Sequence, residues 1–134
     1  MPAAETFIDS LVYEPLVEWP ERLKTALGAL RSATASTIDE CGHALAAGYL
    51  VAVSAGAALD TSGVPKVVLR QAPRALKSKA RASLFPLALK ALETIRNPKS
   101  EMMRLMSEAD DFQVFLEQLS LLEKELRRQS TKTK

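Results

Sequence analysis

Cysteine and histidine are almost absent from this chain, and their scarcity excludes several kinds of site. A single cysteine, Cys41, leaves no internal disulfide. A single histidine, His43, means that a metal site would need Cys41 or a carboxylate such as Asp39 beside it. On a helix, Cys41 and His43 point roughly 200° apart and cannot share an ion, and Asp39 with His43 supplies only two ligands. We therefore expect no metal and no cofactor.

Recognisable catalytic motifs are also missing. The sequence contains neither a P-loop nor the glycine pattern of a dinucleotide-binding turn, and it offers no pair of carboxylates in a recognisable cleft sequence. We therefore expect a protein that is not an enzyme. The alternative is a catalytic site that no motif reveals, in a pocket that converges on Asp39, Glu40 and His43.

Aromatic side chains are few, with seven among 134 residues, whereas alanine and leucine are abundant. This composition favours closely packed helices over a β-sandwich or barrel built from aromatic and β-branched strands. The length suits one domain, and 47% hydrophobic with 25% charged residues is typical of a globular protein. The sequence therefore predicts an all-α single domain over residues 1–134, a compact bundle of five to seven helices.

Long hydrophobic runs are missing too. The longest apolar stretch covers residues 44–59, shorter than the roughly 20 residues that span a membrane, so we expect no membrane association and keep a membrane helix as the weaker alternative. The N-terminal residues MPAAETFIDS lack the basic start and apolar core of a signal peptide. Together with the lone cysteine, these features favour a cytoplasmic or similarly reducing location.

The stretch from 37 to 60 is the expected centre of the bundle. Ser36 or Thr37 followed by Asp39 and Glu40 is typical of a capped helix start, and between Glu40 and Asp60 only His43 can carry a full charge. A helix that is apolar on nearly every side is buried on nearly every side. Every fourth residue from Gly48 to Gly56 is glycine or alanine, so another helix can pack closely on that face.

Shorter helices are expected around this centre. Pro73 removes a backbone donor and disfavours the helical conformation at the residue before it, so the segment 65–82 should form two short helices or a kinked one. Residues 129–134 are expected to be a frayed tail. The remaining helices are predicted at 5–13, from Trp19 to about residue 33, at 83–96, after Pro98, and from Asp110 onward.

Charge is unevenly distributed, although the net charge is only +2. Residues 1–60 hold eight acids and three bases, a net of −5, whereas residues 61–100 hold nine bases and one acid, a net of +8. The remaining residues, 101–134, hold seven acids and six bases. This asymmetry is the feature of the sequence that bears most directly on function.

The basic residues of the middle block are spaced like one face of a helix. Five of them follow steps of four, four, three and four, and Lys79 lies nearby. Cations in such a row can follow a phosphate backbone with little dependence on base sequence. We therefore predict a non-catalytic small subunit of a larger assembly that binds the backbone of RNA or DNA, through these residues: Lys66, Arg70, Arg74, Lys77, Lys79 and Arg81.

Two alternatives to nucleic-acid binding remain open for this basic face. It can be an ordinary solvated surface, or it can pair with the acidic N-terminal block of the same chain or of a neighbouring subunit. The stretch also lacks the interleaved aromatic residues that stack on unpaired bases.

A second functional class rests on the last helix. Large apolar residues recur there in steps of three and four, like the seam of a coiled coil. Such a seam can pack inside the bundle or form an interface with another subunit or a second copy, which would make the protein a helical adaptor or oligomerisation module. Methionines at 102, 103 and 106 either fill the core or line an adaptable groove. The predicted interface residues are Phe112, Phe115, Leu119, Leu122 and Leu126.

Overall fold

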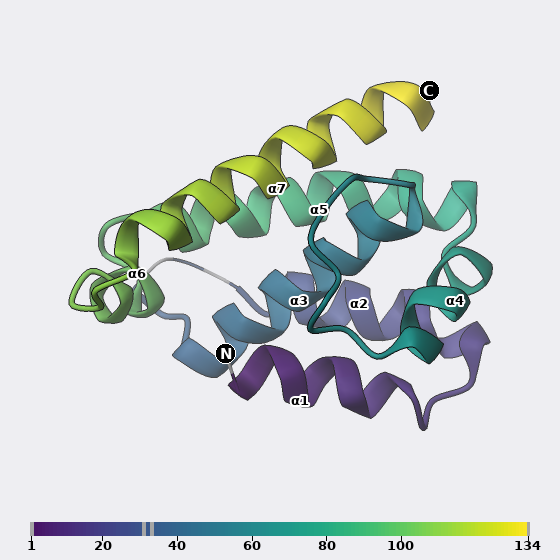
Figure 1. The fold of residues 1–134 in the computed structure, drawn as a ribbon, viewed down its shortest axis with the longest axis horizontal. Coiled ribbons are helices and arrows are strands. Elements are labelled where there is room, and N and C mark those ends of the chain that lie inside the picture. Colours follow the sequence, from purple (N-terminus) through teal and green to yellow (C-terminus); the bar gives the residue numbers. More distant parts are fainter. Residues whose placement is uncertain (1, 31, 33, 134) are drawn as a thin grey trace.

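The computed structural model describes residues 2–30, 32 and 34–133. Within these residues the chain forms α-helices and one 3-10 helix, with no strand, which confirms the predicted all-α bundle (Figure 1). The elements in chain order are α1 (Pro2–Leu11), η1 (Leu16–Glu18), α2 (Trp19–Gly28), α3 (Ile38–Ser54), α4 (Lys66–Ala75), α5 (Ser78–Arg96), α6 (Glu101–Met106) and α7 (Phe112–Thr133).

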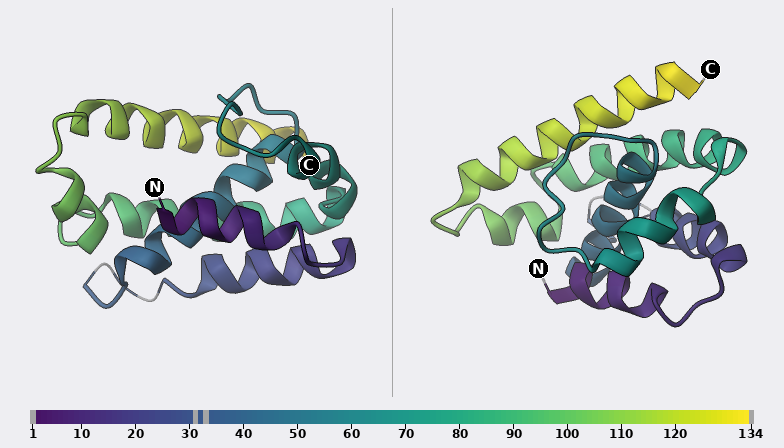
Figure 2. Two further views of the ribbon diagram at one scale, coloured as in Figure 1. Left: turned by 60° about the horizontal axis from the view of Figure 1, so that its bottom comes forward. Right: turned by 45° about the vertical axis from the view of Figure 1, so that its right-hand side comes forward.

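Helix α3 lies at the centre of the bundle, as predicted. It packs against each of the other α-helices, from α1 to α7. In Figures 1 and 2, α1 and α2 lie on one side of α3 and α5 and α7 on the other, while α4 and α6 lie at opposite ends. Leu50, Val51 and Ala47 of α3 are fully buried. The central position follows from the residue composition, because a helix with no polar face must be covered all round.

The start of α3 is the capping box that the sequence indicates. The Thr37 side chain accepts a hydrogen bond from the Glu40 backbone N–H at 3.1 Å, and the Glu40 carboxylate accepts one from the Thr37 N–H at 2.9 Å. These two bonds satisfy backbone donors that the first turn of a helix leaves free.

The end of α3 differs from the prediction, since the helix stops at Ser54 rather than near Asp60. Gly56 adopts a positive φ of 95°, and its N–H donates to the Val53 carbonyl at 3.0 Å. The Ala57 N–H donates to the Ala52 carbonyl at 3.1 Å. This pair of bonds is a Schellman motif, which ends a helix where glycine permits the left-handed turn. Gly56 is therefore a helix terminator and does not belong to the close-packing face.

Gly48, by contrast, does lie at a helix contact. It is buried, and a Cβ built on it would lie 3.7 Å from the Cβ of Ala88 on α5. Small residues on both helices thus let α3 and α5 approach closely, as the spacing of small residues predicts at this position.

The C-terminal tail also differs from the prediction. Helix α7 continues through Thr133, so residues 129–133 are helical rather than frayed, and Lys134 lies outside the described residues. Gln129 is only 4% exposed, and the Thr131 hydroxyl donates to the Arg127 carbonyl at 3.0 Å. Packing against the bundle thus reaches Gln129, whereas Thr131 and Lys132 beyond it are exposed.

Candidate functional site

Helix α4 presents three of the predicted cations on one exposed face. Lys66, Arg70 and Arg74 are separated by four residues each, and all three are exposed. The opposite face of α4 carries Val68 and Ala72, which are fully buried against the core. Burial of that apolar face fixes the rotation of α4, so the basic side chains necessarily point outward.

The predicted row of cations is divided between two helices. Helix α4 runs through Pro73 and ends at Ala75, three residues later than a break at Pro73 would place it. Leu76 leaves the helical conformation, with φ −112° and ψ 80°, and Lys77 is the extended N-cap of α5. We name the exposed cations of this region the basic surface. It consists of Lys66, Arg70, Arg74, Lys77 and Lys79.

Part of the basic surface borders a shallow depression of about 620 Å³. Arg74, Lys77 and Lys79 line it from α4 and α5, and Leu16, Val17 and Pro20 line it from η1 and α2. Helix α4 packs against η1, which holds these two sides together. Three of the predicted cations, one from α4 and two from the start of α5, therefore line the same depression, although they do not share one helix.

Arg81 has a different position from the other predicted cations. It is half-buried, and its Nη1 donates hydrogen bonds to the carbonyl oxygens of Leu76 at 2.8 Å and Ser54 at 3.3 Å. Its guanidinium thus fixes the end of α3 to the junction between α4 and α5. Nη1 is therefore engaged within the fold, and Nε is buried without a hydrogen-bond partner, so Arg81 does not share the exposed surface of the other predicted cations.

The basic surface forms no ion pair within the part of the chain that the structure describes. The ion pairs found there involve other bases, such as Arg22 with Glu14 and Arg96 with Glu123. Within the described residues, no carboxylate of the acidic N-terminal block lies within ion-pairing distance of these cations, and pairing with a neighbouring subunit stays an alternative.

The expected interface on α7 packs inside the bundle. Phe115, Leu119, Leu122 and Leu126 are at most 6% exposed, and α7 packs against α5 and α3. Phe112 is partly buried against the same core. Of the two alternatives for the seam, internal packing describes these side chains, since the chain itself covers them. The methionines follow the same pattern, with Met102 and Met103 buried in the core.

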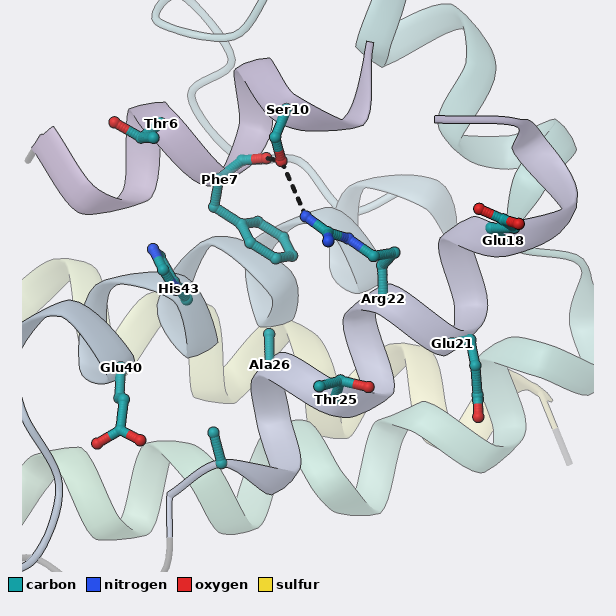
Figure 3. A pocket seen from close by; sticks show the side chains of 11 residues that line it. Thr6, Phe7, Ser10, Glu18, Glu21, Arg22, Thr25, Ala26, Glu40 and His43 are labelled. Atoms are coloured by element: carbon teal, nitrogen blue, oxygen red, sulfur yellow. Dashed lines mark hydrogen bonds between the residues drawn. The ribbon is translucent and has the colours of Figure 1, made fainter. Parts of the chain in front are cut away.

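A second depression, of about 760 Å³, lies between α1, α2 and the start of α3 (Figure 3). The Phe7 ring lies between His43 and Arg22, with a centroid distance of 5.5 Å to His43 and 5.9 Å to the Arg22 guanidinium carbon. Arg22 donates from Nη2 to the Ser10 hydroxyl at 3.1 Å. Carboxylates of Glu18 and Glu21 also line this depression, which makes it acidic where the first one is basic.

Of the residues named for a catalytic site that no motif reveals, Glu40 and His43 both line this second depression, whereas Asp39 is not among its lining residues. Glu40 completes the capping box, His43 lies against Phe7, and Cys41 is fully buried. Burial raises the pKa of the Cys41 thiol, and the carboxylates of Glu101 and Glu40 raise it further, which disfavours the reactive thiolate. Among the described residues, no three His, Cys, Asp or Glu side chains are grouped closely enough to hold a metal ion. Nor does any helix in those residues have the length and hydrophobicity needed to cross a bilayer.

Two apolar side chains that the sequence pattern did not single out are highly exposed, and one of them, Val17, lines the same depression as Arg74 and Lys77. Tyr13 is 89% exposed and Val17 is 84% exposed, the two most exposed large hydrophobic residues in the described chain. Both lie in the connection between α1 and α2, and η1 within that connection packs against α4. The sequence could have indicated this exposure, because Tyr13 and Val17 lie on either side of Pro15 in a short connection, and short connections run over the protein surface.

The fold and its exposed basic surface define a small all-α protein built around one buried helix. The chain belongs to the family described as Domain of unknown function (DUF4259), whose model matches residues 3–118. The match includes α1 to α6, the whole basic surface and the first turns of α7. Neither the curated proteins nor the solved structures contain a match to the chain.

Proposed function

We propose that this protein is a non-catalytic subunit that binds the backbone of a nucleic acid through its basic surface. The observation that carries the proposal is that five exposed cations on α4 and the start of α5 have no ion-pair partner in the described residues. Unpaired cations held close together repel one another, and a polyanion relieves that repulsion. A nucleic acid also gains entropy on binding because its condensed counterions are released.

The start of α5 adds to the positive potential. Helix α5 has no side-chain cap and no acid in its first turn. The free N–H groups there carry the positive end of the helix dipole, which favours an anion such as phosphate. Lys77 and Lys79 flank this end and are exposed. The dipole and the side chains thus act on the same anion.

Charge reversal with a matched control tests the proposal. In one variant Arg74, Lys77 and Lys79 become Glu. In the control Lys90, Lys99 and Arg104 become Glu; these exposed bases do not line the depression of Arg74, and their replacement changes the net charge by the same amount. Affinity for a mixed-sequence oligonucleotide is measured by fluorescence anisotropy across a salt series. We expect only the first variant to lose most of the binding and to reduce the slope of log K against log salt by about two to three, since each lost phosphate contact removes about 0.7–0.9. Equal loss in both variants, or wild-type binding in the first, would contradict the proposal.

The adaptor function retains one specific observation in its favour. Val114 and Leu121 lie seven residues apart on α7 and are 51% and 43% exposed, so they share a face that the bundle does not cover. An oligomer or partner helix seated there would bury them. Light scattering after size exclusion of the wild type and of Leu121→Lys tests this alternative: a stable oligomer that the substitution dissociates would favour the adaptor, and a monomer in both would exclude self-association through this face.

A further inference from the structure

We infer that two copies of this chain associate through the outer face of α7, with the two helices antiparallel about a two-fold axis beside Leu121. This inference does not depend on nucleic-acid binding. Helix α7 lies at the edge of the bundle (Figure 1). Its outer face carries residues spaced by three and four, which keeps their side chains on one side of the helix. All of them are exposed: Val114, Glu117, Leu121 and Lys124.

Two of the residues in this outer row are large and apolar. Val114 and Leu121 are among the six exposed large hydrophobic residues of the described chain, and they lie one heptad apart. The core seam of the same helix, which includes Leu119 and Leu122, is buried. Helix α7 therefore has a second apolar strip that its own bundle does not cover, and another helix is the element that covers such a strip.

A groove of about 250 Å³ borders Leu121. Residues of α3, of α7 and of the connection from α3 to α4 line it, and its walls include the apolar side chains of Leu45 and Leu59. The Tyr49 hydroxyl donates a hydrogen bond to the carbonyl oxygen of Asp60, which holds that connection against α3. Because the exposed leucine and the groove are neighbours, a two-fold arrangement lets Leu121 of each copy cover the groove of the other.

The charges on either side of Leu121 favour a second copy in the antiparallel orientation. Glu117 lies four positions before Leu121, and Lys124 lies three positions after it. A two-fold axis at Leu121 therefore places Lys124 of the second copy within one residue of Glu117 of the first, about 1.5 Å along the helix axis. Symmetry forms the same pair twice. A parallel partner in register would instead bring Glu117 to Glu117 and Lys124 to Lys124, and these like charges repel.

Both charged residues are available for these pairs. Glu117 and Lys124 are exposed, and neither takes part in an ion pair within the part of the chain that the structure describes. The neighbouring carboxylates of Glu123 and Glu125 already pair with arginines of the same molecule. The groove shares no lining residue with the depression of Arg74, so the two surfaces are separate.

Analytical ultracentrifugation of the full chain over a concentration series tests the inference. We expect a dimer for the wild type. Its dissociation constant should rise about tenfold or more in Glu117→Lys and in Lys124→Glu, because each change turns two attractive pairs into two repulsive ones. Lys24→Glu makes the same change of charge at an exposed residue of α2, and it should leave the dissociation constant unchanged.

Mixing the two single variants distinguishes a second copy from any other occupant of this face. A heterodimer of Glu117→Lys with Lys124→Glu regains both attractive pairs, so the mixture should associate about as tightly as the wild type. This recovery would also show that both variants are folded. A monomeric wild type, wild-type association by either single variant, or a mixture that does not recover would overturn the inference. None of these outcomes bears on nucleic-acid binding, which the charge-reversal titrations test separately.

Discussion

Arg81 donates a hydrogen bond to the carbonyl oxygen of Ser54, which is the last residue of α3 and lies 27 positions earlier in the chain. The same Nη1 donates to the Leu76 carbonyl, where α4 has just ended. One guanidinium therefore satisfies carbonyls at the ends of two helices, and its positive charge lies at the negative end of the α3 dipole. Through these bonds the central helix orients the junction that carries Lys77 and Lys79.

Arg81→Ala should lower the free energy of unfolding by about 1–3 kcal/mol, because hydrogen bonds from a charged donor to part-buried carbonyls are lost. Lys79→Ala, two residues earlier and exposed, should change it by no more than about 0.5 kcal/mol. Urea denaturation followed by Trp19 fluorescence measures both. A smaller effect for Arg81→Ala than for Lys79→Ala would show that the hydrogen bonds do not hold the junction.

Leu119→Ala should destabilise the protein by about 2–5 kcal/mol, because the leucine is 1% exposed within the contact of α7 with the bundle. Leu121, on the same helix, is 43% exposed, and its replacement by alanine should cost about 0.5 kcal/mol. Thermal unfolding followed by circular dichroism compares the two variants. Equal losses of stability in the two variants would show that burial of Leu119 does not hold α7 against the bundle.

The glycines at 48 and 56 should respond to alanine with opposite signs. Gly48→Ala adds a Cβ at an ordinary contact distance of 3.7 Å from Ala88 and improves helix propensity, so it should stabilise the fold by up to about 1 kcal/mol. Gly56→Ala places a side chain at φ 95° and should destabilise it by about 1 kcal/mol or more. Chemical denaturation of both variants provides the measurement. A shift of the same sign in both would contradict the assignment of Gly56 as the helix terminator.

Stability should decline at alkaline pH partly because of Cys41. Burial, with a smaller contribution from Glu101 and Glu40, raises the pKa of the folded thiol above its ordinary value. This contribution to stability is fully present below the ordinary thiol pKa and is lost as pH rises through the higher pKa of the folded state, since the unfolded thiol ionises first. The free energy of unfolding of the wild type, relative to Cys41→Ala, should therefore fall with rising alkaline pH. A difference that stays constant with pH would contradict the raised pKa.

Local chemistry predicted those parts of the fold that depend on neighbours in sequence. The capping residues Thr37 and Glu40 mark the start of α3, and the absence of any polar face on that helix places it at the centre. The end of the same helix was missed, since the apolar composition continues past Ser54 while the backbone turns at Gly56. The periodicity of α7 predicted its apolar face but not which partner covers it.

Nucleic-acid binding stays a prediction until the titrations are made. What the amino-acid sequence alone determined is an all-α bundle around a buried helix with a concentration of positive charge after it, because helix periodicity, capping and net charge are properties of nearby residues. Tertiary structure alone decided that Arg81 is held by the carbonyls of Ser54 and Leu76, that the α7 seam is internal, and that η1 packs against the basic helix α4. These relationships join segments far apart in the chain, and only the packing of the helices brings them into contact.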